Sequence, residues 1–265
     1  MAEYNRIVVK VGTSTLTYDN GKPNIGRIDK LCRVLSDISN SGKEVVLVTS
    51  GAIGVGVSKL GLSERPAEIP ARQACAAVGQ CELMYMYDKF FGEYGKKTAQ
   101  VLITADVIDN ESRRANVSAC MEELLKMGAI PVVNENDAVS VDELTGHNIG
   151  DNDNLSSIVA VLINADALIM LTDKDGLFDR DPGTYPDAVR IPVVLTIDDN
   201  VCALAGGSGS KRGTGGMITK LQAAQRSCGA GIETYICAGD DPENVRRILA
   251  GDIIGTHFVA KRNNL

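Results

Sequence analysis

The sequence is poor in residue types on which many catalytic and metal sites depend. Among its 265 residues there are only two histidines, His147 and His257, and the seven cysteines include no C-x-x-C pair. A structural zinc site, built from cysteine and histidine ligands, is therefore not expected. The same shortage argues against a Ser/His/Asp or Cys/His catalytic arrangement. We expect no metal site made by the protein itself.

Clustered positive charge is also missing. Asp and Glu (34) outnumber Lys and Arg (27), so the formal net charge is -7. The densest basic spot is "SGSKRGTGG", which contains only Lys211 and Arg212. A nucleic-acid interface needs a basic face, so we expect no nucleic-acid partner. A nucleotide phosphate is a better match for this short segment.

Long hydrophobic runs are absent too. No stretch approaches the roughly 18 consecutive apolar residues of a membrane span, and the N-terminus has no basic stretch followed by an apolar core. An odd number of cysteines without paired spacing is typical of reduced, mostly buried thiols in the cytosol. We therefore expect a cytoplasmic protein without a membrane partner.

The sequence does contain a regular alternation of apolar, β-branched runs and helical patterns. Strands are predicted over 7–11, 44–50, 99–104, 129–134, 167–172 and 233–238, and helices over 26–42, 71–95, 113–128, 154–165 and 215–231. Several strand runs are continuously apolar, which is typical of strands buried on both faces. The sequence thus predicts one α/β domain over 1–265, with a mostly parallel open sheet covered by helices on both faces.

Small, hydroxyl, amide and acidic residues follow four of the predicted strands. These segments are Gly12–Ser14, Ser50–Ala52, Asn134–Asp137 and Thr172–Asp173. In open parallel sheets, ligands bind outside the carboxyl ends of the strands. Any single polar loop is unremarkable, but the agreement of four loops predicts a ligand site at this edge.

A lysine near the end of the first predicted strand is the first candidate. In "VVKVGTSTL", Lys10 precedes Gly12, whereas the lysine of a Walker-type loop follows the glycines. A buried ammonium group there would serve phosphate oxygens, helped by the amides of Gly12 and Thr13. The alternative is a lysine on an edge strand that extends its ammonium group to solvent.

A glycine-rich turn follows the second predicted strand. In "TSGAIGVGVSKLGL", the spacing of Gly51, Gly54 and Gly56 is not that of a dinucleotide fingerprint, and this argues against a nicotinamide-dependent dehydrogenase. The turn is better suited to a backbone that approaches a small anionic ligand at a helix N-terminus.

Two acidic and amide runs precede the predicted helix at 154–165. Asn134–Asp137 precedes the intervening segment, and 151–154 ("DNDN") leads into the helix. Asp153 or Asn154 could simply cap the helix, but capping needs one side chain and not four. The remaining groups are suited to a ligand's ammonium and carboxylate. The EF-hand spacing is not met, so a calcium loop is not expected.

A second glycine loop precedes the helix predicted at 215–231. In "GSKRGTGGMITKLQAA", the loop leads into a helix whose first turn carries Thr219 and Lys220. Free amides at a helix N-terminus together with a lysine favour an anion site. The alternative is a plain flexible loop.

Six motifs together resemble the amino acid kinase family. They are "KVGTSTL", "TSGAIGVG", "NENDAV", "GDNDNLS", "LTDKDGLF" and "GTGGMITK", in the family's order and spacing over essentially the whole chain. Within the family they look most like the glutamate 5-kinases. The resemblance implies ATP-dependent phosphorylation of the side-chain carboxylate of L-glutamate to L-glutamyl 5-phosphate, the first step of proline biosynthesis. A sibling kinase for another carboxylate, a carbamate or a nucleoside monophosphate, and a non-catalytic amino-acid sensor, are the alternatives.

The resemblance also implies roles for individual residues. The catalytic residues would be Lys10, Lys220 and Asp153. L-glutamate would be bound by Ser50, Gly51, Ala52, Asn134, Asp137 and Asn152. ATP would be bound by Lys10, Gly12, Thr13, Thr172, Asp173, Thr214, Gly215, Gly216, Met217, Ile218, Thr219 and Lys220. The part before about residue 170 would bind glutamate and the later part ATP.

Further expectations follow from the same resemblance. Mg²⁺ would enter with ATP, held by phosphate oxygens and water. Relatives assemble as dimers or tetramers, so a homo-oligomer is expected, and proline is expected as a feedback inhibitor. Many glutamate 5-kinases carry a C-terminal PUA domain, and none is expected within these 265 residues.

Overall fold

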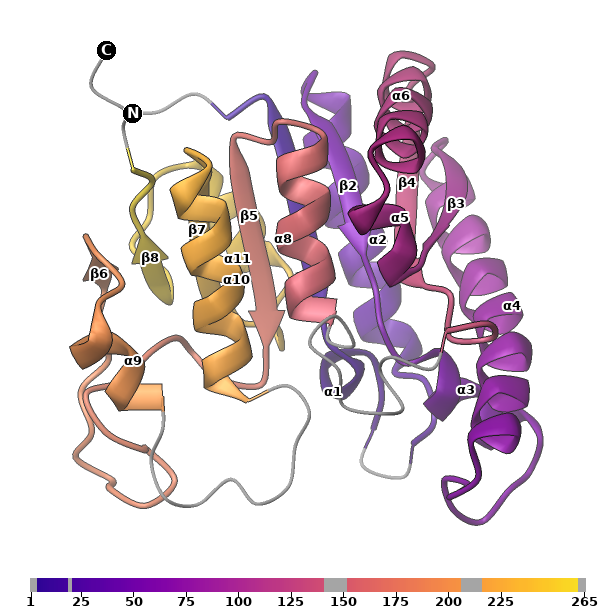
Figure 1. Ribbon diagram of the computed structural model, residues 1–265, viewed down its shortest axis with the longest axis horizontal. Helices are drawn as coiled ribbons and strands as arrows, with labels where there is room; N and C mark the ends of the chain where they lie inside the picture. The colour runs from indigo at the N-terminus through magenta and orange to yellow at the C-terminus, as the bar shows by residue number, and fades with distance from the viewer. Residues whose placement is uncertain (1–3, 19–20, 141–151, 206–215, 262–265) are drawn as a thin grey trace.

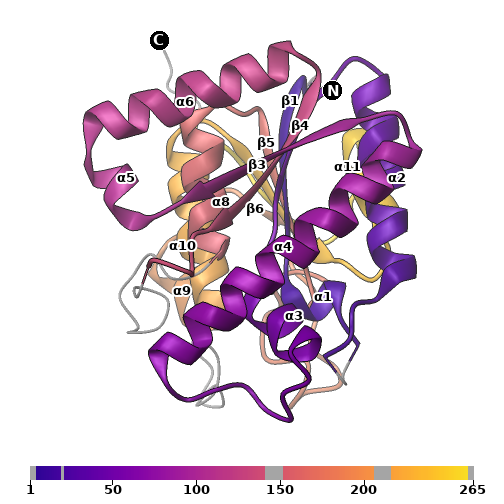
Figure 2. The ribbon, with the colours of Figure 1, turned by 90° about the vertical axis from the view of Figure 1, so that its right-hand side faces the viewer.

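A single parallel-rich sheet organises the molecule. The computed structural model describes residues 4–18, 21–140, 152–205 and 216–261. These residues form an eight-stranded sheet in the order β3-β4-β2-β1-β5-β7-β8-β6 (Figure 1). The neighbouring strands are parallel except for β7 and β8, which are antiparallel. Helices cover both faces, as the view along the sheet shows (Figure 2).

The elements have the following bounds. The strands are β1 (Arg6–Val11), β2 (Glu44–Val48), β3 (Lys97–Ile103), β4 (Ala129–Glu135), β5 (Ala167–Thr172), β6 (Val193–Val194), β7 (Glu233–Ala238) and β8 (Thr256–Phe258). The helices are α1 (Thr13–Leu16), α2 (Ile25–Asn40), α3 (Ala52–Lys59), α4 (Ile69–Glu93), α5 (Ala105–Asp109), α6 (Glu111–Lys126), α8 (Asn152–Leu162), α9 (Asp199–Ala205), α10 (Met217–Gly229) and α11 (Glu243–Leu249).

The predicted fold class is confirmed, and so are the predicted elements. The six predicted strands are β1 to β5 and β7, and the five predicted helices are α2, α4, α6, α8 and α10. The prediction missed β6, β8 and several short helices. One of these helices is α3, which lies where the glycine spacing of the sequence predicts a turn. Gly54 and Gly56 are poor helix formers, and packing against α4 outweighs that propensity.

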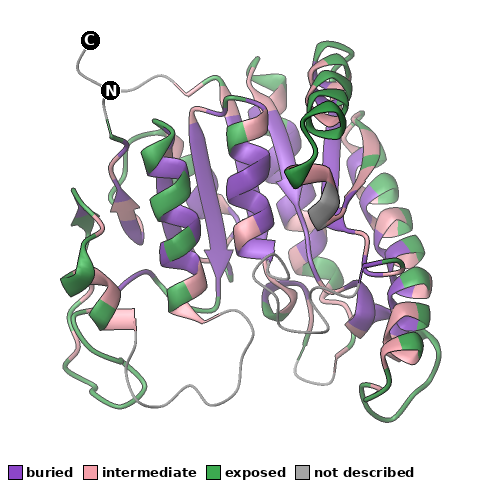
Figure 3. Cartoon of the chain, in the orientation of Figure 1, coloured by how far each residue is buried: buried purple, intermediate pink, exposed green. Residues whose placement is uncertain are grey.

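The core is divided into two hydrophobic layers, one on each side of the sheet. Alternate residues of β1 show the division, because Ile7 and Val9 pack in one layer with residues of α2 and α4, whereas Val8 packs in the other with residues of α8 and α10. The central strands are therefore buried on both faces (Figure 3). This double burial explains the continuous apolar runs in the sequence.

The chain changes direction across the sheet between β1 and β5. After β1, the chain builds β2, β3 and β4 on one side of it, and β5 begins the half that continues through β7 on the other. Such a switch point opens a crevice at the carboxyl ends of the strands. Because β1 lies between β2 and β5, the edge-strand alternative for Lys10 is wrong.

Helices α3 and α4 pack backbone against backbone. A Cβ atom added to Gly79 of α4 would lie 1.8 Å from the carbonyl oxygen of Ala52, and one added to Gly56 of α3 would lie 1.8 Å from the carbonyl oxygen of Cys75. Both positions are buried. The close approach therefore requires glycine on each helix, and it holds the N-terminus of α3 against α4.

Two further observations concern the whole chain. Among the described helices, none is both long and apolar enough to cross a membrane. All seven cysteines are free thiols, and four of them, Cys32, Cys75, Cys228 and Cys237, are buried.

The glycine contact between α3 and α4 yields a prediction about stability. Gly79→Ala should lower the free energy of unfolding by about 3 kcal/mol, because overpacking against a rigid backbone forces the helices apart. Gly92→Ala on the same helix is the matched control, since nothing lies within 4 Å of its added Cβ. It should be neutral or stabilising by up to about 0.5 kcal/mol. Urea denaturation measures both, and equal effects would contradict the assigned contact.

Candidate active site

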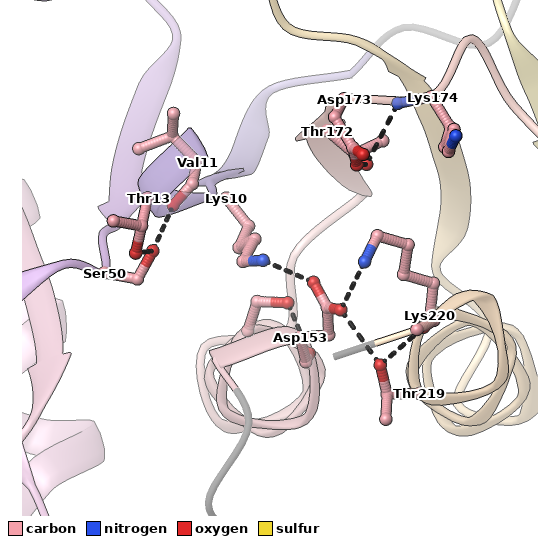
Figure 4. Close-up of polar contacts among 12 residues, drawn as sticks. Lys10, Val11, Thr13, Ser50, Asp153, Thr172, Asp173, Lys174, Thr219 and Lys220 are labelled. Carbon is pink, nitrogen blue, oxygen red and sulfur yellow. Dashed lines mark hydrogen bonds and ion pairs between the residues drawn. The ribbon is translucent and has the colours of Figure 1, made fainter. Parts of the chain in front are cut away.

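A buried ionic bridge lies at the carboxyl end of β1. The Nζ atom of Lys10 donates to Oδ1 of Asp153 at 2.5 Å, and Nζ of Lys220 donates to Oδ2 of the same carboxylate at 3.0 Å. Thr219 Oγ1 donates to Oδ2 at 3.2 Å (Figure 4). The fractional exposures of Lys10, Asp153 and Lys220 are 6%, 0% and 7%. The bridge joins three elements that are distant in sequence.

Each element positions its residue for a local reason. Lys10 stands one residue before the end of β1, so its side chain reaches the crevice edge of the sheet. Asp153 occupies the first turn of α8, where the helix dipole favours a carboxylate. Lys220 lies in the first turn of α10, which packs against α8. The packing of the two helices thus brings their N-terminal ends together.

The electrostatics of this bridge favour an anion. Burial by itself would raise the pKa of Asp153, but the charges of Lys10 and Lys220 outweigh burial and lower the pKa below its ordinary value. The carboxylate is therefore ionised at neutral pH. Two ammonium groups and one carboxylate give the cluster a formal charge of +1. Charge buried in this way costs free energy unless it is compensated, and a bound phosphate would compensate it.

The predicted nucleotide residues gather beside Lys220. Thr172 Oγ1 donates to Asp173 Oδ1 at 2.9 Å directly after β5. Gly216 is the N-cap residue of α10. Its carbonyl oxygen lies 2.8 Å from Thr219 Oγ1, so the single hydroxyl hydrogen of Thr219 is shared between this oxygen and Oδ2 of Asp153. A cavity of about 570 Å³ is lined by Asp173, Gly216, Met217, Ile218 and Lys220, among others. The predicted residues Thr214 and Gly215 lie outside the described residues.

The loops after β1 and β2 meet on the other side of Lys10. Ser50 Oγ donates to the carbonyl of Val11 at 3.1 Å, and Thr13 Oγ1 donates to Ser50 Oγ at 3.3 Å. Figure 4 shows both side chains across Lys10 from Thr172 and Lys220. Gly51 has φ = 95°, a conformation that favours glycine, and it leads directly into α3. This turn aims the N-terminus of α3 at the crevice.

The predicted acceptor residues after β4 are also buried. Asn134 is fully buried at the end of β4, and Asp137 follows with 6% exposure. Asp137 and Ala52 line a second cavity, of about 310 Å³. Asn152 begins α8 next to Asp153, and within the described residues its Oδ1 atom has no hydrogen-bond partner. Of the predicted acceptor residues, Ala52 and Asp137 line the smaller cavity, whereas the larger cavity is lined by five predicted nucleotide residues: Asp173, Gly216, Met217, Ile218 and Lys220.

The observed contacts bear on the alternatives left open by the sequence. The carboxylate of Asp153 receives hydrogen bonds from two lysines and Thr219, which a simple helix cap does not require. Gly12 lies beside the ammonium group of Lys10, since a Cβ atom added to Gly12 would be 3.8 Å from Nζ of Lys10. This is an ordinary van der Waals contact, so the distance by itself does not require glycine at this position.

Sequence reasoning missed two polar residues on α4 that support this region. Tyr87 shares a hydrogen bond of 2.8 Å between its hydroxyl and Oγ1 of Thr49, the residue before Ser50. Gln80 accepts a hydrogen bond from Asn134 Nδ2 at 2.8 Å. The two α4 residues are seven apart, which places them on one helix face. The signal available in the sequence was this pair of polar residues, spaced so that both lie on the buried face of one helix.

Comparisons with known proteins agree with this geometry. The model of the amino acid kinase family matches residues 5–238. A glutamate 5-kinase from Clostridium perfringens is 56% identical over 263 residues, covering 99% of this chain and 98% of that protein. A glutamate 5-kinase from Listeria monocytogenes is 53% identical over 258 residues, covering 97% and 94%.

Solved structures of lower identity share the fold. The UMP kinase from Bacillus anthracis superposes with a TM-score of 0.64 at 16% identity, covering 98% of both chains. An isopentenyl phosphate kinase gives 0.64 at 17% identity, covering 96% of this chain and all of that one. The family match spans most of the sheet and both lysines of the bridge. The chain therefore belongs to the amino acid kinase family.

Proposed function

We propose that this chain is a glutamate 5-kinase, which transfers the γ-phosphoryl group of ATP to the side-chain carboxylate of L-glutamate. The observation that carries this proposal is the buried Lys10–Asp153–Lys220 bridge, whose formal charge is +1. The two curated relatives support glutamate as the acceptor, since each is named a glutamate 5-kinase and matches nearly the whole chain.

The chemistry explains why the described site offers lysines in place of a general base. A glutamate carboxylate, with a pKa of about 4.3, is already ionised at neutral pH. Its oxygen forms a bond to the γ-phosphorus while the bond to the bridging oxygen of ADP breaks, and no proton need move. The barrier comes from bringing an anion to a polyphosphate, so catalysis is mostly positioning and electrostatic stabilisation.

The two lysines would divide this work. Lys10, on the side of Ser50 and Thr13, would neutralise charge on the transferring phosphoryl group, with the amides of Gly12 and Thr13 beside it. Lys220, which lines the larger cavity, would hold the nucleotide phosphates. Asp153 would orient both ammonium groups. Its lowered pKa keeps it ionised, so it is not a proton carrier.

The two cavities would take the two substrates. Residues after about 170, including Thr172, Asp173 and the start of α10, would bind ATP. Ser50, Gly51, Ala52, Asn134, Asp137 and Asn152 would bind glutamate. The described residues contain no group of three or more His, Cys, Asp or Glu side chains that could cage a metal. Mg²⁺ would enter on the ATP phosphates and neutralise part of their charge.

Two expected partners belong to the same proposal. Proline shares the α-carboxylate and α-ammonium groups of glutamate, so it would compete at the acceptor cavity. The chain would assemble as a homo-oligomer, which sedimentation of the purified protein would test. A sibling kinase is the second candidate, because the two solved structures that share the fold are named as kinases of phosphorylated acceptors, UMP and isopentenyl phosphate.

The acceptor can be tested directly. Purified protein with ATP, Mg²⁺, L-glutamate and hydroxylamine should form a hydroxamate, because hydroxylamine traps an acyl phosphate. Omission of either substrate is the control, and added proline should reduce the rate. Turnover with a carbamate or a nucleoside monophosphate, but none with L-glutamate, would assign the chain to a sibling activity.

Removal of the Lys10 ammonium group should impair the chemical step. Lys10→Ala should lower kcat by about 10²- to 10³-fold, the usual loss when one stabilising donor is removed from a transition state. The KM for glutamate should change little. Lys59→Ala is the control, since this lysine is exposed and pairs with Glu82 on the protein surface. An unchanged kcat in Lys10→Ala would exclude the catalytic role.

Loss of the Asp137 carboxylate should instead weaken acceptor binding. Asp137→Ala should raise the KM for glutamate by about 10-fold or more, because hydrogen bonds to charged groups contribute about 1.5–3 kcal/mol. The KM for ATP should stay the same. Steady-state kinetics with each substrate varied separately provides the measurement. A KM for glutamate equal to that of the unmodified protein would remove Asp137 from the acceptor site.

A further inference from the structure

Gln80 and Asn134 form an isolated amide pair between α4 and β4. Their single hydrogen bond runs from Nδ2 of Asn134 to Oε1 of Gln80. The exposures are 7% for Gln80 and 0% for Asn134. Within the described residues, Nε2 of Gln80 and Oδ1 of Asn134 have no hydrogen-bond partner, although both atoms are shielded from solvent. The pair thus keeps one free donor and one free acceptor.

Such atoms are costly to a folded protein. A buried polar atom without a partner costs about 1–3 kcal/mol, and most buried polar atoms are paired for that reason. An apolar pair at these positions would avoid the cost. The free donor and acceptor are therefore best explained by a ligand that pairs with both.

The location of the pair points to the ligand. Gln80 lines the cavity of about 310 Å³ together with Ala52 and Asp137, two residues of the proposed acceptor site. Its helix is held in place there by the Gly56–Gly79 backbone contact and by the bond between Tyr87 and Thr49. Gln80 is therefore carried by a helix that contacts the acceptor site at several points.

We propose that Gln80 determines acceptor specificity by recognising the α-amino-acid end of the substrate. Its Nε2 atom donates to the α-carboxylate, and the Oδ1 atom of Asn134, set by the amide pair, accepts from the α-ammonium group. Asp137 adds negative charge favourable to the ammonium group. This assignment rests on the proposed function, since it takes L-glutamate to be the acceptor, and it adds a residue from α4 to that site.

Three acceptors separate the two contacts. L-glutamate carries both groups, glutarate lacks the ammonium group, and 4-aminobutanoate lacks the α-carboxylate. Gln80→Met removes the donor while retaining a side chain of similar length. The matched control is Gln225→Met, because Gln225 of α10 is exposed and lines neither of the two cavities. Values of kcat/KM are compared for each acceptor, with inhibition constants against L-glutamate where turnover is too slow to follow.

Gln80→Met should lower kcat/KM by about 10-fold or more for L-glutamate and glutarate, through KM, since a donor to a charged group is lost. The value for 4-aminobutanoate should fall by a clearly smaller factor, because this acceptor loses only the orientation of Asn134 and not the donor, and the KM for ATP should stay the same. Gln225→Met should leave the kcat/KM values for all three acceptors nearly unchanged.

Other outcomes overturn the assignment. An equal loss for all three acceptors would show a purely structural role, and a loss confined to L-glutamate and 4-aminobutanoate would place Gln80 at the ammonium group. Thermal unfolding checks that Gln80→Met folds. If it does not fold, Gln80→Ala takes its place, with the same expected pattern of kcat/KM values for the three acceptors. Absence of hydroxamate from the unmodified protein with L-glutamate would instead refute the proposed function.

Discussion

Two ammonium groups share one buried carboxylate in this protein, and the arrangement of the site depends on that ionic bridge. Asp153 places one negative charge between the positive charges of Lys10 and Lys220. Removing such charges from water is expensive, so the arrangement is a weak source of stability. Two ammonium groups held side by side in this way are well suited to binding a phosphate. The same feature that is unfavourable for folding is therefore favourable for phosphoryl transfer.

The bridge also ties together the two halves of the fold. Lys10 comes from the strand at the switch point, Asp153 from the helix that precedes β5, and Lys220 from a helix of the later half. A displacement of either half would separate an ammonium group from the shared carboxylate. In our proposal, the geometry of the chemical step is thus coupled to the packing of α8 against α10.

Helix α4 positions residues on the acceptor side of the site, as the ionic bridge does on the phosphate side. It is the longest helix in the described part of the chain, and its inner face contacts the loop that follows β2 and the end of β4. Gly79 permits a backbone contact with α3, and Tyr87 anchors Thr49 beside Ser50. The acceptor loops therefore rest on a rigid helix, which limits the conformations that their polar groups can adopt.

The sequence by itself determined six of the eight described strands, the main helices and the identity of most candidate site residues. Continuous apolar runs reveal strands buried on both faces, and the residues after those strands must lie at one edge because the strands are parallel. The motif resemblance singled out Lys10, Asp153 and Lys220 by type and order. The function class followed from that resemblance, and a lysine pair without a general base fits the charge neutralisation that such a reaction needs.

Tertiary structure alone decided which groups meet. The pairing of Lys10 with Asp153 spans 143 residues, and no local pattern encodes a contact of that range. Helix α3 was missed because its glycines are poor helix formers, yet those glycines permit the contact with α4. Gln80 looked like an ordinary helical residue until folding buried it against Asn134. Local propensity describes one segment at a time, whereas burial and pairing depend on segments that only the folded chain brings together.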